Sequence, residues 1–478
     1  MCEWPPNETA VSRRRGLWRA GALGLLTLTL AGCLQAEKPD PALDVPGRFR
    51  AQAAPPAPPV SATWWQSFRS PELSGFAQAA QTGNLDIAAA VARVRQADAQ
   101  ATVAGAPLLP VLDGSGDATR SRSSSRSGRA APVNNSLQVG LRASWEIDVW
   151  GKNRALADAA ALGALASRHD RDAIALTALA STATTYFQIL AAQERKRIAN
   201  QNLASATRVL ALIRERLAAG TATSLDIAQQ ESVVANQRAT IPPLDQEIDQ
   251  NAATLAVLTG RAPERITVRG GGLNAVVLPR VAPGVPAQLL TRRPDVQSAE
   301  AQLEAAGADV VAARAAFFPT IALTTQGGYE SLALKSLFGP GAAFWSIGAG
   351  LAQPIFQGFR LEGQLEQARG REAELLQTYR KSVIEAFADV ERALIAQRQL
   401  ALQERLQAEA EASARRAYEI SEQRLREGTV DLVTVLNTQQ SLFLTQDALT
   451  RVRLSRLLAA VALYQALGGG WTFDKPRP

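Results

Sequence analysis

The 478-residue sequence has few of the side chains on which most enzymes and metal sites depend. Its one histidine, His169, excludes a catalytic triad built on histidine and a histidine-rich metal site. His169 lies between Arg168 and Asp170, and we expect it to face solvent. A phosphate-binding loop would place a glycine-rich run just before a helix. The glycine run at 468–470 instead follows a predicted helix, so it does not fit this pattern. We therefore predict neither an enzyme nor a bound cofactor.

Clustered positive charge is also missing, although the net charge is +7. Arginine and glutamate alternate at short intervals through residues 371–427, a pattern typical of a solvated helix face. A nucleic-acid site would need basic residues gathered on one surface with aromatic residues among them, and aromatics make up only 5% of the chain. We therefore expect no nucleic-acid partner.

The N-terminus has the form of a secretory signal. Four arginines between 13 and 19 precede an apolar stretch at 20–30, which is too short for a permanent membrane helix. Leu30-Ala31-Gly32-Cys33 follows and resembles a bacterial lipobox, in which cleavage before the cysteine leaves a thiol that carries lipid. The alternative is an ordinary signal peptide with an incidental cysteine. We predict a signal peptide at 1–32 and lipid attachment at Cys33.

Two cysteines are all that the chain has, and Cys2 would leave with the signal peptide. The mature chain would keep one thiol, so no internal disulfide can form, and lipidation explains the single cysteine. Leu34 follows it, where aspartate would retain a lipoprotein at the inner membrane. We therefore expect an outer-membrane location, with the proline- and alanine-rich segment 33–62 as a tether.

Long apolar runs are absent after the signal, so a membrane could be crossed only by strands. Apolar and polar residues alternate from Leu137 to Val149, and we predict strands near 110–121, 136–149, 320–329 and 344–356. An apolar face of this kind packs on a protein core or faces lipid, and the alternation alone leaves both interpretations open.

Glycine and proline are both missing from residues 164–219, enough for a helix of about 80 Å. A second such run covers 371–427. Tyr379, Val383, Phe387, Val390 and Leu394 form a coiled-coil-like stripe in it.

The order of elements occurs twice. Arg216, Gly220 and Thr221 recur 208 residues later as Arg424, Gly428 and Thr429. We predict a tandem repeat of helix, hairpin, long helix and helix, with repeats at 63–272 and 273–471 and a tail at 472–478. Two hairpins give four strands, too few to close a membrane barrel, so strands in lipid would require oligomerisation.

Three segments carry a family resemblance: Leu289-Leu290-Thr291-Arg292-Arg293-Pro294-Asp295, Ala315-Ala316-Phe317-Phe318-Pro319, and the C-terminal run from Leu463 to Trp471. With them, the chain resembles the TolC-like outer-membrane efflux proteins, closest to the lipoprotein subgroup that serves resistance-nodulation-division pumps. The resemblance covers nearly all of the mature chain. It implies a mainly α fold with a transmembrane β-barrel, in which a homotrimer forms a 12-stranded barrel and a long α-helical periplasmic tunnel.

The same resemblance implies partners and sites. A periplasmic adaptor would dock at the tip residues Arg216, Gly220, Thr221, Arg424, Gly428 and Thr429, and an inner-membrane pump would supply the energy. The family closes its tip with inward side chains, which assigns a gate to Asp431 and to Asp226, the nearest acid in the tip of the first repeat. Asn437 stands where relatives commonly carry aspartate, which puts a second acidic ring in doubt. The alternative for each aspartate is a solvated residue at a helix N-terminus.

Two other functions stay open. A periplasmic coiled-coil lipoprotein could act as a scaffold, although a scaffold has no need for four amphipathic strands. The same duct could also serve type I secretion or metal efflux.

Overall fold

The computed structural model describes residues 43, 45–50, 60–122, 124, 133–279, 281 and 284–471. The signal peptide at 1–32, Cys33, most of the tether and the tail at 472–478 lie outside the described residues. The described chain forms two compact units. Unit 1 contains residues 95–166 and 299–379, and unit 2 contains the rest.

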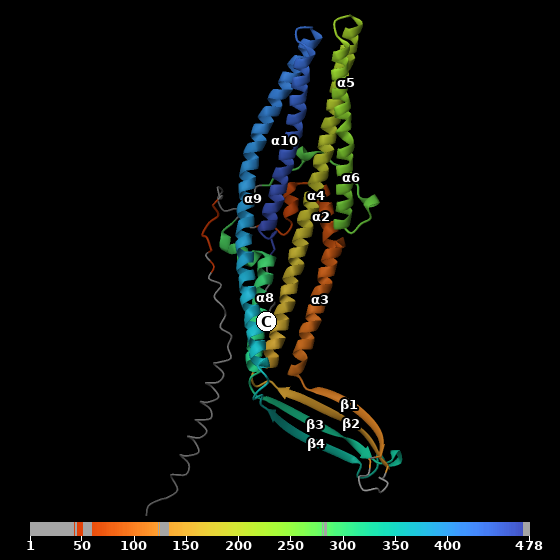
Figure 1. Cartoon of the computed structure of the whole chain (residues 1–478), viewed down its shortest axis with the longest axis vertical. Helices are drawn as coiled ribbons and strands as arrows, with labels where there is room; N and C mark the ends of the chain where they lie inside the picture. Colours follow the sequence, from red (N-terminus) through yellow and green to blue (C-terminus); the bar gives the residue numbers. More distant parts are fainter. Residues whose placement is uncertain are drawn as a thin grey trace, which may run out of the picture. The chain divides into compact units, whose positions relative to one another are not determined.

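Unit 1 holds one antiparallel sheet of four strands in the order β1-β2-β3-β4, which lie side by side in Figure 1. The strands are β1 (Val111–Arg122), β2 (Val133–Ile147), β3 (Thr320–Ser331) and β4 (Ala343–Ala352). Each predicted hairpin is therefore confirmed, and the pairing of β2 with β3 joins the two hairpins into one sheet.

The last strand is shorter than predicted, because it ends at Ala352 and not near residue 356. Pro354 lacks a backbone N–H and cannot continue the ladder. Gln353 instead donates its side-chain amide to the carbonyl of Phe317 at 3.0 Å.

The register places one kind of side chain on each face of the sheet. Leu141 of β2 lies opposite Gly327, which lies opposite Trp345 of β4. Because side chains alternate along a strand, the face shared by Leu141 and Trp345 carries nearly all of the large apolar residues. Its members are Leu112, Leu137, Val139, Leu141, Trp145, Ile147, Ile321, Leu323, Trp345, Ile347 and Leu351. The opposite face carries Asp113, Asp117, Gln138, Arg142, Glu146, Gln326 and Glu330.

Two helices of 67 residues, α4 (Lys152–Ala218) and α9 (Arg360–Arg426), dominate the chain. Both begin and end 208 residues apart, the offset of the repeat. Each is longer than its glycine-free run, since α4 includes Gly163 and α9 includes Gly363 and Gly370. A helix interior tolerates a glycine at a cost of about 1 kcal/mol, which the packing of a long helix can offset.

The shorter helices follow the predicted order. They are α2 (Pro71–Gly83), α3 (Leu85–Gly105), α5 (Ser224–Ala239), α6 (Ile241–Leu258), α7 (Leu289–Arg292), α8 (Pro294–Ala315) and α10 (Leu432–Ala466). Asn84 caps α3, because its side-chain oxygen accepts from the amides of Asp86 and Ile87 at 2.9 and 3.0 Å. Short 3-10 turns (η2–η7) join several of the helices, among them η2 (Trp64–Phe68) and η5 (Leu273–Ala275).

The main core of unit 2 lies among η2, α2, α4, α6 and α10. Trp64 stacks on Tyr464 with ring centroids 5.1 Å apart, and Phe68 packs on Phe187 at the same distance. Among the described residues, α4 contains one stretch that is long and apolar enough to cross a membrane, contrary to expectation, and 56% of that stretch is buried within the chain. A buried core helix passes the same test.

Two side chains are placed differently from expectation. In the stripe of α9, Ala386 and Val390 are buried, whereas Phe387 is only half-buried. The expectation that His169 faces solvent is wrong: the ring is buried, and Trp471 meets it edge-on with centroids 5.4 Å apart. Trp471 also donates to Asp172 at 2.9 Å, so the C-terminal tryptophan holds this part of α4. Burial lowers the pKa of His169.

Candidate functional site

The predicted docking residues lie at two turns of unit 2. Tip 1 (residues 216–226) joins α4 to α5, and tip 2 (residues 424–434) joins α9 to α10 (Figure 1). In tip 1 the amide of Thr221 donates to the carbonyl of Arg216 at 2.8 Å, and the amide of Gly220 donates to Leu217 at 2.9 Å. This pair of bonds is the Schellman motif that ends a helix.

Tip 2 repeats this backbone. The amide of Thr429 donates to Arg424 at 2.9 Å, and that of Gly428 donates to Leu425 at 3.1 Å. Gly220 and Gly428 both have φ of +75°, a left-handed conformation that favours glycine. Both glycines therefore end a long helix, while docking of an adaptor at these tips stays a prediction.

The two tips begin their second helices with different caps. In tip 1 the hydroxyl of Thr223 accepts from the amide of Asp226 at 3.3 Å, and the carboxylate of Asp226 accepts from the Thr223 amide at 2.8 Å. This reciprocal pair is a capping box. It gives Asp226 a local structural role at the start of α5.

In tip 2 the cap is Asp431 itself, whose carboxylate accepts from the amide of Thr434 at 2.9 Å. Hydrogen bonds from the Thr434 side chain and backbone lower the pKa of Asp431. The group is fully exposed, as a residue at an open gate or a solvated cap would be. Asn437, six residues further along the chain in α10, is exposed.

A small apolar cluster joins the two tips. Its buried members are Val209 and Ile213 of α4, Ala414, Tyr418 and Leu425 of α9, and Leu432, Val435 and Leu442 of α10. Arg216 of α4 donates to the carbonyl of Leu425 of α9 at 2.9 Å. Gln230 of α5 donates to the carbonyl of Ala206 of α4 at 2.9 Å and to the side chain of Gln439 of α10 at 3.5 Å. The sequence drew no attention to Gln230 or Gln439, although both are fully buried.

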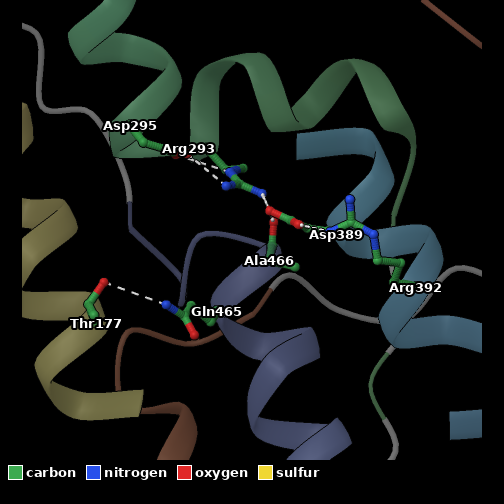
Figure 2. A network of polar contacts seen from close by, with 7 residues as sticks. All are labelled: Thr177, Arg293, Asp295, Asp389, Arg392, Gln465 and Ala466. Carbon is green, nitrogen blue, oxygen red and sulfur yellow. Dashed lines mark hydrogen bonds and ion pairs between the residues drawn. The ribbon is translucent and has the colours of Figure 1, made fainter. Parts of the chain in front are cut away.

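One polar network explains part of the motif at 289–295. Arg293 binds both carboxylate oxygens of Asp295 at 3.0 and 2.7 Å and reaches Asp389 of α9 at 3.0 Å (Figure 2). Burial opposes its charge, but the two carboxylates outweigh burial and raise the pKa of Arg293. Arg293 therefore joins the motif at 289–295 to Asp389, a residue that the sequence analysis did not single out.

The final motif residues allow close packing. Gly468 has φ of +81°, and a Cβ added to it would lie 2.0 Å from the carbonyl oxygen of Arg292. Only glycine fits there, so the turn that follows α10 can lie directly against the segment that holds Arg293. Within the part of the chain that the structure describes, no group of three or more histidine, cysteine or acidic residues could hold a metal ion.

Comparison with known proteins places this architecture. The family model described as outer membrane efflux protein matches residues 76–261 and 285–469. The pyoverdine export outer membrane protein OpmQ of Pseudomonas aeruginosa is 41% identical over 458 residues, which cover 94% of this chain and 96% of OpmQ. The probable outer membrane lipoprotein SilC of Salmonella typhimurium is 32% identical and covers 92% of this chain and 96% of its own.

Solved structures agree. The outer-membrane channel OprN superposes with a TM-score of 0.87 and 25% identity, covering 92% of this chain and 100% of the OprN chain. The fold is therefore TolC-like, as the resemblance implied. With two matched repeats, full-length relatives and a common architecture, this chain belongs to the outer membrane efflux protein family.

Proposed function

We propose that this chain is the passive exit duct of a tripartite efflux system for drugs or other small amphiphilic compounds. Three copies would share a 12-stranded barrel in the outer membrane. A periplasmic adaptor would connect tips 1 and 2 to an inner-membrane pump that supplies the energy.

The exposed apolar face of the sheet carries this proposal. Trp345, Ile347 and Leu351 of β4 are 77%, 76% and 71% exposed in the single chain. A soluble protein would cover such a patch, since each Å² of buried apolar area stabilises the folded protein by about 25 cal/mol. A lipid bilayer or a second copy covers it equally well. A scaffold lipoprotein would leave the patch without a function.

The open edges of the sheet support the trimer. Among the described residues, β1 and β4 each pair on one side only. An unpaired edge is unstable in lipid, because its amides and carbonyls lack partners there. Closure of β4 on β1 of the next copy removes every edge, and three copies give a barrel wide enough for a lumen, whereas eight strands are filled by side chains.

The chain's relatives suggest the range of cargo. OpmQ is named for pyoverdine export, and SrpC of Pseudomonas putida for solvent efflux. Such different compounds fit a passive duct whose selectivity lies in the pump. Lipid attachment at Cys33 agrees with the name of SilC as a probable lipoprotein.

Native mass spectrometry of protein extracted from the outer-membrane fraction tests the proposal. We expect a trimer whose chains begin at Cys33 and carry the mass of lipid. A monomer or dimer, or recovery from the soluble periplasm alone, would contradict the duct and favour the scaffold. A Cys33→Ser variant that still forms trimers would separate the anchor from the assembly.

The gate can be tested at Asp431. Three copies would place three carboxylates at the tip, which would favour cations. Asp431→Asn keeps a capping acceptor but removes the charge, so cation selectivity in planar bilayers should fall, and Asp431→Ala should alter conductance as well. Asp226→Asn makes the same change at the gate candidate of tip 1, so the two variants compare the two candidates. Single-channel behaviour that is unchanged in both Asp431 variants would remove Asp431 from the gate.

A further inference from the structure

A polar pocket of about 350 Å³ lies within unit 2, among α4, η5, α9 and α10. This volume is within the range of small-molecule sites, about 300–1,000 Å³. We name it the arginine pocket after Arg197 of α4, Arg415 of α9 and Arg453 of α10, which line it together with Gln201, Asn274 and Gln446. Three arginines from three helices therefore meet at one cavity.

Each arginine commits one edge of its guanidinium to a carboxylate. Arg197 binds Glu194 through Nε and Nη2 at 3.2 and 2.5 Å. Arg415 binds Glu411 through the same two atoms at 3.1 and 2.5 Å. Nη1 of each of these arginines has no partner among the described residues and can donate to a ligand.

Arg453 leaves more of its donors available. Its Nε contacts Glu404 at 3.3 Å, and Glu404 is also bound by Arg456. Both Nη atoms of Arg453 lack a partner within the described chain. Three guanidinium groups and two carboxylates line the pocket, so the excess charge there is positive.

The carboxylates lie deeper than the cations. The side chains of Glu194 and Glu411 are 11% and 14% exposed, whereas those of Arg197 and Arg415 are 54% and 50% exposed. The neutralised acids form the base of the site, and the guanidinium groups remain accessible. This arrangement favours an anion, since guanidinium binds oxyanions with charge-assisted hydrogen bonds.

Gln446 adds a second, independent observation. Its side chain is 8% exposed, and its buried Oε1 has no hydrogen-bond partner among the described residues. A buried acceptor without a partner is costly, so the site is incomplete without a donor. A ligand for this pocket would supply oxygen acceptors for the arginines, and a hydroxyl on it could donate to Gln446.

We propose that the arginine pocket binds a small oxyanion that carries a hydroxyl group. Monohydrogen phosphate and hydroxycarboxylates such as citrate share this chemistry. The bound anion would join α4, α9 and α10 in the helical part of unit 2. The proposal concerns a resident ligand of the helices and does not depend on what the duct exports.

Isothermal titration calorimetry on the full-length, detergent-purified protein tests this site at constant ionic strength in chloride. The probes are inorganic phosphate, citrate and sulfate. Sulfate has the size and charge of monohydrogen phosphate but no hydroxyl. We expect one saturable site per chain for phosphate or citrate, with sulfate binding about tenfold more weakly. Binding of phosphate alone or of citrate alone would identify which source of the shared chemistry fits.

Variants assign the binding to named residues. Arg415→Gln with Arg453→Gln should weaken binding at least tenfold, and Gln446→Leu should remove the preference for phosphate over sulfate. Arg451→Gln is the matched control, because Arg451 makes an i,i+4 pair with Asp447 on the same helix but does not line the pocket. It should bind as the wild type does.

Three results would overturn the site: no saturable heat with phosphate or citrate, unchanged binding in the double arginine variant, or equal loss in Arg451→Gln. Circular dichroism and oligomeric state check that each variant is folded. If the double glutamine variant does not fold, Arg415→Lys with Arg453→Lys takes its place, because lysine retains the charge but not the fork of donors. Unchanged phosphate affinity in this lysine variant, together with an unchanged preference for phosphate over sulfate in Gln446→Leu, would equally reject the proposal.

Discussion

Tips 1 and 2 share one backbone but use different side chains. Both end a 67-residue helix with the same two hydrogen bonds and a glycine at φ of +75°. Yet Leu217 of tip 1 is 39% exposed, whereas its counterpart Leu425 is 1% exposed. The caps differ too, with a threonine at 223 and an aspartate at 431. The two tips thus share the geometry that the chain reversal requires, while their side chains differ.

The leucines should give the largest difference. Leu425→Ala removes a side chain from the cluster that joins the tips and should reduce local stability by about 2–5 kcal/mol, whereas Leu217→Ala should cost about 0.5 kcal/mol. Amide hydrogen exchange of peptides that cover each tip measures both values. Equal, large losses would show that a neighbouring copy or partner buries Leu217.

Replacing the glycine of either tip should cost the same stability. Gly220→Ala and Gly428→Ala each place a Cβ at positive φ, with no other atom within 4 Å of it. The cost is then conformational alone and should be about 1–2 kcal/mol in both tips. Hydrogen exchange at the C-terminal ends of α4 and α9 checks this. A cost in one tip only would mean that the two turns are not equivalent in the assembled protein.

Much of what the two tips share could be predicted from the sequence, and the features that could not be predicted have a physical cause. The helix ends at the glycines and the strand alternation depend on neighbouring residues, so they were visible in the sequence. The offset of 208 was visible because the same motif recurs. The end of β4 was missed because apolar alternation continued past Pro354, whose missing donor ends the ladder.

The site was harder to predict, because its contacts join distant parts of the chain. Arg293 and Asp389 are 96 residues apart, and Gln230 and Gln439 are 209 apart. His169 was expected to be exposed from its charged neighbours, but Trp471 covers it from the other end of the chain. Local pattern carries no information on such pairs.

The caps test whether divergence changed stability or only chemistry. Thr223→Ala removes the hydroxyl that accepts from Asp226 and should destabilise the first turn of α5 by about 1 kcal/mol. Thr223→Asp converts tip 1 to the cap of tip 2 and should restore that stability. Hydrogen exchange of residues 224–229 provides the measurement. If Thr223→Ala exchanges like the wild type, packing and not the capping box holds α5 at this end.

The smallest expected effect is a dependence on pH that should be stronger in tip 2 than in tip 1. The folded pKa of Asp431 is lowered from 3.8, so its contribution is complete above that ordinary value and is lost as pH falls through the lowered one. In tip 1 the hydroxyl of Thr223 does not titrate in this range and still accepts from the amide of Asp226, so acid weakens only the second bond of the capping box, from the Thr223 amide to the Asp226 carboxylate. On acidification below pH 4, exchange at residues 432–436, corrected for intrinsic rates, should rise more than at 224–229. Asp431→Asn should abolish this difference, because an amide caps without titrating; a difference that persists would place the acid-sensitive group elsewhere in tip 2.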